Sequence, residues 1–164
     1  MATAYNMVQI IPYSVHPPKY NPGELYMIDF EYTLVGSVVT GDTYTTPANA
    51  IPTNGIRIID TMLIMPPLDT NATPTATISV GDSGSSTRFI NAALAGSTQA
   101  TQMRVFINQA QGLTAGVVSS GSGYLYGATA SAPQLIATVG GTVATAASTG
   151  TIRLRVKFYC TGEN

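Results

Sequence analysis

The segment between residues 151 and 159 alternates strictly between apolar and charged side chains, and this pattern constrains the fold more than any other feature of the sequence. Apolar residues occupy every second position, and the positions between them are basic: Ile152, Leu154, Val156 and Phe158 against Arg153, Arg155 and Lys157. Because successive side chains of a strand point to opposite faces, the pattern predicts a β-strand with one buried face and one basic face.

Further short apolar segments, separated by turn residues, indicate a chain built from strands. Residues 26–34 alternate in the same way, and residues 56–65 are almost continuously apolar and stop at Pro66-Pro67, which favours a buried strand. Strands are also predicted at residues 75–80, 102–107, 124–126 and 134–139, and residues 88–94 are predicted to form a short helical turn or a loop crossing. Seven or eight such strands without a convincing amphipathic helix predict an all-β fold, an antiparallel β-sandwich of jelly-roll type.

The N-terminal residues differ from the rest of the chain because they are rich in proline. Pro12, Pro17, Pro18 and Pro22 exclude a helix or an inner strand, so residues 1–23 are predicted to form an extended arm and residues 24–164 the sandwich domain. Deleting residues 1–20 is expected to leave the sandwich folded. The arm also carries Tyr5, Tyr13 and Tyr20, which suit either anchors in an interface or contacts that hold the arm to its own sandwich.

The scarcity of charge bears on function. Only 9% of the residues are charged, against about 25% in an average soluble domain. A free domain usually keeps itself soluble with a charged coat, so this surface favours an assembly in which neighbours cover it; a plain β-protein with an uncharged polar surface is the alternative.

The net charge of −1 argues against nucleic-acid binding, and no apolar run approaches the length of a membrane span. The absence of a visible signal peptide and the single Cys160 predict synthesis in a reducing cytoplasm.

The charges are distributed unevenly along the chain. Residues 1–82 contain two basic and seven acidic residues, whereas residues 83–164 contain five basic residues and one acidic residue. The two halves either pair within one fold or orient subunits against one another. The same alternatives apply to Arg153, Arg155 and Lys157, which form either a solvent-facing stripe or a docking face for an acidic neighbour.

The sequence contains only weak evidence for catalytic or metal-binding residues. The tetrapeptide Gly81-Asp82-Ser83-Gly84 is similar to the segment around the nucleophile of trypsin-like proteases, but the chain's one histidine, His16, lies in the arm, so a turn stabilised by Asp82 is favoured. Asp29 and Glu31 share a strand face at a spacing that glycosidases use, yet any strand with alternating acids shows it. The aspartates show no calcium-loop spacing. We therefore predict no catalytic, cofactor or metal site.

A pattern within residues 56–158 consists of residues 56–65, 77–82, 88–90, 123–126 and 135–140, followed by Gly150 before the final strand. In this pattern the chain resembles a family of small β-sandwich structural proteins encoded among the head genes of tailed bacteriophages. The resemblance implies a capsid decoration (cement) or head-fibre protein of the virion, bound as a homotrimer to the lattice of the major capsid protein on the outer head. The alternatives are a receptor- or glycan-binding module that uses Tyr124 and Tyr126, a tail or neck component, and a hydrolase that uses Asp29, Glu31 or Ser83.

Overall fold

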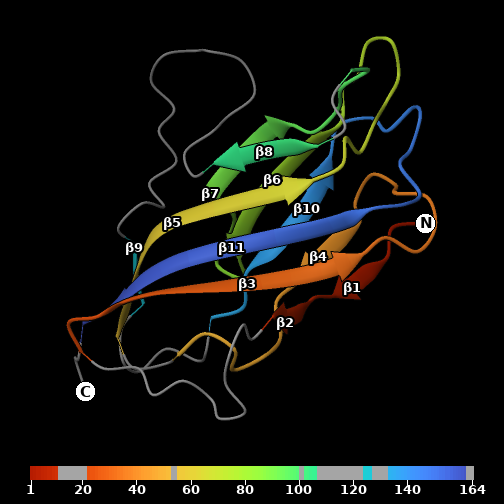
Figure 1. Ribbon diagram of the computed structural model, residues 1–164. Helices are drawn as coiled ribbons and strands as arrows, with labels where there is room; N and C mark the ends of the chain where they lie inside the picture. Colours follow the sequence, from red (N-terminus) through yellow and green to blue (C-terminus); the bar gives the residue numbers. More distant parts are fainter. Residues whose placement is uncertain (11–21, 53–54, 100–101, 107–123, 127–132, 162–164) are drawn as a thin grey trace, which may run out of the picture.

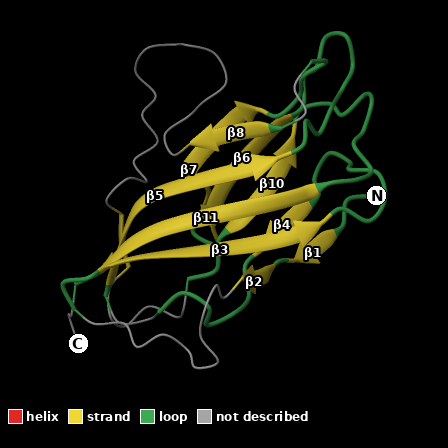
Figure 2. Ribbon diagram, in the orientation of Figure 1, coloured by secondary structure: helices red, strands yellow, loops and turns green. Residues whose placement is uncertain are grey.

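The protein is a sandwich of two β-sheets, described here from a computed structural model (Figure 1). The structure describes residues 1–10, 22–52, 55–99, 102–106, 124–126 and 133–161. These residues form strands and loops and contain no helix (Figure 2), and therefore none long and apolar enough to cross a membrane. The strands are β1 (Ala4–Asn6), β2 (Val8–Ile10), β3 (Leu25–Thr33), β4 (Thr43–Thr45), β5 (Ile56–Met65), β6 (Thr77–Asp82), β7 (Ser85–Leu94), β8 (Met103–Phe106), β9 (Tyr124–Tyr126), β10 (Ile136–Gly140) and β11 (Thr151–Cys160).

The order of the strands in the two sheets confirms the predicted sandwich. One sheet has the order β1-β4-β10-β6-β7, and the other has the order β2-β3-β11-β5-β8, with β9 also paired to β5. Each described pairing is antiparallel except that of β1 with β4. Without the two short N-terminal strands and β9, four strands remain in each sheet, and the chain crosses between the sheets as it does in a jelly roll.

The central strand of the six-stranded sheet is β11, which lies between β3 and β5 (Figure 1). Ile152, Leu154, Val156 and Phe158 are 0% exposed and face the other sheet. Arg153, Arg155 and Lys157 are only partly buried and lie on the outer face. The alternation in the sequence therefore predicted both the strand and its two faces correctly.

Strand β5 departs from the prediction because it is not buried along its whole length. Its inward positions change parity at a β-bulge, where Lys157 is paired with Asp60 but the next residue, Phe158, is paired with Ile58. The bulge adds one residue to β5, which directs both Ile59 and Asp60 away from the core. Ile59 is accordingly 38% exposed, although it is a large apolar residue in a mainly apolar segment.

One element was predicted incorrectly and one strand was not predicted. Residues 88–94 form the second half of β7 rather than a helical turn or a loop, because β7 pairs with β6 across the turn at residues 82–85. Irregularities in this pairing, together with the positive φ of 46° at Ala92, obscure the alternation in the sequence. Strand β4 was not predicted; it has three residues, and its Tyr44 is fully buried.

The N-terminal residues belong to the sandwich itself. Strand β1 pairs with β4 at the edge of one sheet, and β2 pairs with β3 at the edge of the other. Met7, between these strands, is 2% exposed, and its backbone N–H donates to the carbonyl of Thr45. These pairings of residues 4–6 and 8–10 argue against the expectation that residues 1–20 can be removed without loss of folding, and the effect of the deletion stays a prediction. The prolines at positions 12, 17 and 18 lie outside the described residues, and the predicted boundary at residue 23 stays a prediction.

Candidate interaction surface

The outer face of the six-stranded sheet carries two adjacent columns of opposite charge. Asp29 and Glu31 lie on β3, and Arg155 and Arg153 lie directly opposite them on β11. Arg155 donates two hydrogen bonds of 2.8 Å to the two oxygens of Asp29, and Arg153 forms an ion pair with Glu31. These hydrogen bonds to Asp29 raise the pKa of the Arg155 guanidinium. The acidic and basic halves of the chain therefore pair within one fold, and Asp29 and Glu31 are partners of arginines.

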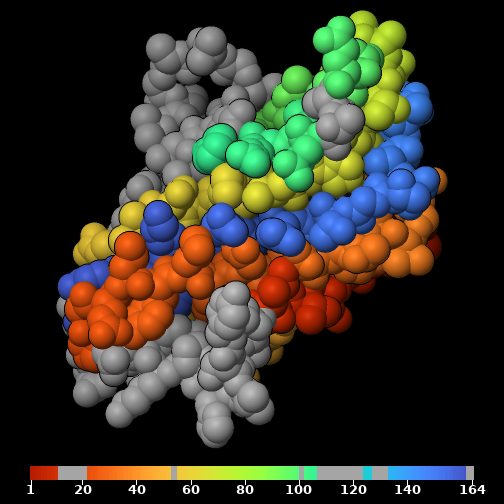
Figure 3. Space-filling model, viewed as in Figure 1, coloured from red at the N-terminus to blue at the C-terminus, as the bar shows by residue number. Residues whose placement is uncertain are grey.

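Apolar side chains flank these columns and remain exposed. Val8 is 69% exposed, Leu25 is 56% exposed and Met27 is 55% exposed. Ile59 on β5, Phe106 on β8, Leu125 on β9 and Tyr159 at the end of β11 are between 37% and 49% exposed. Figure 3 shows this face, with β3 (orange), β11 (blue) and β5 (yellow) side by side across it. Large exposed apolar surfaces on soluble proteins usually mark interaction sites.

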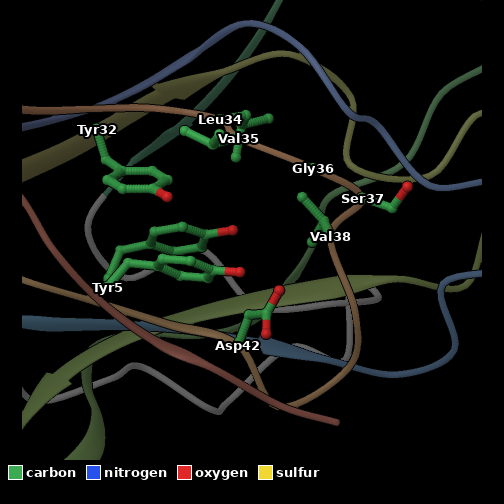
Figure 4. A pocket seen from close by; sticks show the side chains of 9 residues that line it. Tyr5, Tyr32, Leu34, Val35, Gly36, Ser37, Val38 and Asp42 are labelled. Atoms are coloured by element: carbon green, nitrogen blue, oxygen red, sulfur yellow. The ribbon is translucent and has the colours of Figure 1, made fainter.

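A cluster of three tyrosines closes the sandwich near the N-terminus. The Tyr5 ring stacks on Tyr44 with centroids 5.3 Å apart and lies 4.9 Å from the Tyr32 ring. Figure 4 shows Tyr5 and Tyr32 with their hydroxyl groups directed to the same side, near Asp42. Burial and the nearby Asp42 charge raise the pKa of the Tyr44 phenol far above its ordinary value, so it stays protonated. Tyr5 thus packs against its own sandwich, and a role in an interface stays a prediction.

The Asp42 carboxylate binds backbone N–H groups of its own chain. It accepts hydrogen bonds from the backbone N–H groups of Thr3 (2.8 Å) and Val39 (2.9 Å), and the residue is 1% exposed. These bonds fix the N-terminus against the turn before β4. The depression lined by Tyr5, Tyr32 and Val38 is shallow and filled by its own rings (Figure 4). It offers no room for a ligand.

The carboxylate of Asp82 holds the turn between β6 and β7 and connects it to β9. It accepts hydrogen bonds from the backbone N–H groups of Gly84 (2.9 Å) and Ser85 (2.8 Å), from Arg88 (2.7 Å) and from the Tyr126 hydroxyl (2.5 Å). Burial disfavours its charge, but the bonds from Arg88 and Tyr126 outweigh burial and lower the pKa of Asp82. The prediction that Asp82 stabilises a turn at this tetrapeptide is confirmed.

Arg88 and Asp82 also contact Tyr124 and Tyr126, the two tyrosines proposed above to bind a glycan. The guanidinium of Arg88 lies 3.9 Å from the centre of the Tyr124 ring, and the Tyr126 ring packs edge-on against Tyr124 at 4.9 Å. Since one ring face is covered and the Tyr126 hydroxyl is bonded to Asp82, this pair does not present an open stacking surface. The structure gives the glycan-binding alternative no support.

Asp69 is a further buried carboxylate whose bonds are structural. It is 0% exposed and accepts hydrogen bonds from the backbone N–H groups of Asn71 (3.1 Å) and Thr145 (2.9 Å). Burial opposes its charge, but the bonds from Thr145 and Asn71 lower its pKa. In the part of the chain that the structure describes, no three His, Cys, Asp or Glu side chains gather as metal ligands would.

Four of the six predicted interface residues can be placed. Arg153, Arg155 and Lys157 lie together on the outer face of the six-stranded sheet, and Tyr5 lies in the tyrosine cluster. Tyr13 and Tyr20, like His16, lie outside the described residues. The apolar residues beside the charged columns were not proposed, although the alternation of residues 26–34 already placed Met27 on the same face as Asp29 and Glu31.

Four chains of solved structures match this protein, and the following two are among them. A chain in the capsid asymmetric unit of cyanophage Pam1 is 25% identical, with a TM-score of 0.63, and the match covers 90% of this chain and 94% of that one. A chain in the capsid of Ralstonia phage GP4 is 20% identical, with a TM-score of 0.56, and the match covers 89% and 90% of the two chains. No family model and no curated protein matches the sequence. Both similar chains come from phage capsids, and the matches extend across nearly the whole fold.

Proposed function

We propose that this protein is a structural component of a bacteriophage virion, and specifically a decoration protein that binds the outer lattice of the head. One observation supports this most directly: the protein matches a chain in the capsid of cyanophage Pam1 over 90% of its own length and 94% of the other chain, at 25% identity. The low content of charged residues and the exposed apolar side chains on one sheet also suit a surface that neighbours cover. This role is non-enzymatic.

The mechanism that follows is mechanical. A decoration protein binds where subunits of the assembled shell meet and does not bind the dissociated subunits, so its binding free energy stabilises the shell by mass action. A rigid sandwich suits this task because its two sheets are joined by a fully buried core. The major capsid protein is the proposed partner, and Tyr13 and Tyr20 of the predicted arm are the proposed contacts with it.

The lattice proposal is tested with shells assembled from the major capsid protein of the same phage. Purified protein is added to these shells, to tails of the same phage and to dissociated capsid subunits, and binding is measured by co-sedimentation. We expect binding to shells alone, with a higher dissociation temperature of the decorated shells. Binding to tails and not to shells would overturn the decoration role in favour of a tail or neck component.

The arm is tested in the same assay with the double variant Tyr13→Ala and Tyr20→Ala. We expect at least a tenfold loss of affinity for shells. Leu94→Ala, at an exposed position on β7, is the matched control and should bind like the wild type. Equal binding of the arm variant would show that the lattice contact lies elsewhere. The homotrimer implied by the family resemblance stays a prediction that competes with the dimer inferred in the next subsection, and sedimentation velocity distinguishes the two states.

A further inference from the structure

We propose that the outer face of the six-stranded sheet pairs with the same face of a second copy of this chain. The two sheets would lie face to face, related by a two-fold axis that runs parallel to the strands and passes between β3 and β11. This inference rests on the pattern of that face and is independent of the proposed lattice contact.

The first observation is the exposure of large apolar side chains on one sheet face. Three of the most exposed apolar side chains are Val8, Leu25 and Met27, and all three lie on β2 or β3 of the six-stranded sheet. Tyr159, at the end of β11, pairs with Leu25 in the sheet and is 37% exposed. Apolar groups gathered on one face in this way favour a partner that covers them.

The second observation is the register, which arranges the outer side chains in rows across the sheet. One row reads Val8, Glu31, Arg153, Ile64 and Arg104. The next row reads Ile10, Asp29, Arg155, Met62 and Phe106. Each row therefore begins with an apolar residue on β2, continues with an acid on β3 and a base on β11, and has an apolar residue on β5.

A two-fold axis between β3 and β11 makes this pattern complementary to itself. Such an axis keeps each row in place but exchanges its two sides, so β3 of one copy faces β11 of the other. Glu31 then faces the second copy's Arg153, and Asp29 faces its Arg155. Two of the five N–H donors of Arg155 contact Asp29 of its own chain, which leaves other donors for a second carboxylate. Arg153 keeps 42% of its side chain exposed for the same purpose.

The same rotation also brings the apolar positions together. The axis places β2 over β5 of the second copy, so Val8 faces Ile64 and Ile10 faces Met62. At the end of the columns, Leu25 faces Tyr159 and Met27 faces the aliphatic part of Lys157. The bulge in β5 adds Ile59 to this surface, since it turns the side chain outward. In the two rows that contain the ion pairs, charge therefore meets opposite charge, and the apolar residues of β2 meet those of β5.

Other arrangements of two copies do not share this complementarity. A two-fold axis across the strands would place β3 on β3 and β11 on β11, so that like charges would face each other. The size of the face suits a dimer as well. Strands β3, β11 and β5 are nine or ten residues long and about 4.8 Å apart, so together with the three-residue β2 they present roughly 500 Å² per copy. The total of about 1,000 Å² is close to the smallest area expected of a biological interface.

The oligomeric state of the purified full-length chain provides the first test. Sedimentation equilibrium is run on the wild type and on Leu25→Asp and Met27→Asp, which place a carboxylate in the apolar part of the face. We expect a dimer whose dissociation constant rises at least 30-fold in each variant. Val35→Asp and Leu94→Asp are matched controls, because these exposed residues lie outside this face and should leave the dimer intact.

A charge exchange tests the axis itself. The variant Asp29→Arg, Glu31→Arg, Arg153→Glu, Arg155→Glu swaps the two columns and keeps opposite charges adjacent within each chain. Two swapped copies still place acid against base, but a swapped copy facing a wild-type copy places like charge against like charge. Native mass spectrometry of an isotopically labelled mixture should therefore show both homodimers and few mixed dimers.

The outcomes separate the proposal from its alternatives. A monomer at all concentrations, or an oligomer that Leu25→Asp and Met27→Asp leave unchanged, would overturn it. Statistical mixing of wild-type and charge-swapped chains would refute the two-fold axis. Loss of shell binding in these variants, with the wild type monomeric, would assign the face to the capsid protein and overturn the proposed second copy.

Discussion

Replacing Asp82 with alanine is expected to lower the free energy of unfolding by about 3 kcal/mol. The residue is 8% exposed, and its carboxylate accepts hydrogen bonds from two backbone N–H groups, Arg88 and the Tyr126 hydroxyl. Alanine leaves Arg88, whose side chain is only 17% exposed, without its ionic partner. Removing one member of a buried pair typically costs 3–5 kcal/mol, and we place the expected loss at the lower end because Arg88 retains some contact with water.

Asparagine at the same position separates the charge from the hydrogen bonds. Asp82→Asn keeps an oxygen that accepts from the turn, so its expected cost is roughly half that of alanine. Urea unfolding, followed by tyrosine fluorescence and circular dichroism, gives the free energies, and a loss of 3 kcal/mol should lower the melting temperature by about 6–12 °C. Ser83→Ala, at the exposed neighbouring position, is the control and should change stability by less than about 0.5 kcal/mol.

The pH dependence of stability tests the same reasoning. The pKa of Asp82 is lowered in the folded protein, so the unfolded chain binds the proton more tightly and the stabilisation is present above the ordinary value of 3.8. The difference in stability between the wild type and Asp82→Asn should therefore shrink as the pH falls below about 5. A difference that stays constant from pH 7 to pH 3, or an Asp82→Ala variant as stable as the wild type, would refute the account.

Three further predictions concern other parts of the sandwich. Met7→Ala should cost about 3 kcal/mol in urea unfolding because Met7 is 2% exposed, whereas a separable arm predicts no change. Gly81→Ala should cost at least about 3 kcal/mol of unfolding free energy because its Cβ would lie 2.0 Å from the Ser85 carbonyl oxygen. The control Gly84→Ala should cost less, because its Cβ would meet only side-chain atoms at 3.1 Å or more. Equal costs for the two variants would count against the clash at Gly81. Burial raises the pKa of the Cys160 thiol, so a thiol reagent should label it rapidly only after unfolding, and rapid labelling of the native protein would contradict its burial.

Much of the architecture was predictable because the strands of the six-stranded sheet have one buried and one exposed face. Periodicity identified β3 and β11, and proline marked the end of β5. Periodicity did not identify β7, whose pairing with β6 is irregular, or β4, which is too short to show alternation. The proline content also suggested a detached arm, yet the residues that join the two sheets, such as Met7, precede the first proline.

The candidate surface was predictable only in part. The sequence places Arg153, Arg155 and Lys157 on one strand face, and it places Asp29 and Glu31 on another. That the two strands are neighbours depends on pairing between residues more than 100 positions apart, which periodicity does not reveal. The ion pairs, and the flanking role of Val8 and Leu25, therefore emerge only from the order of strands in the sheet.

The position of β11 has a consequence for how this chain folds during synthesis. Asp29 and Arg155 are 126 residues apart in the sequence, and β11 separates β3 from β5 in the sheet. Until the ribosome has released residues 151–160, the edges of both neighbouring strands lack their main partner. Contacts of such long range slow folding and leave strand edges open to association. Nascent chains stalled before residue 151 should therefore depend on chaperones. The six-stranded sheet is completed only at the end of synthesis.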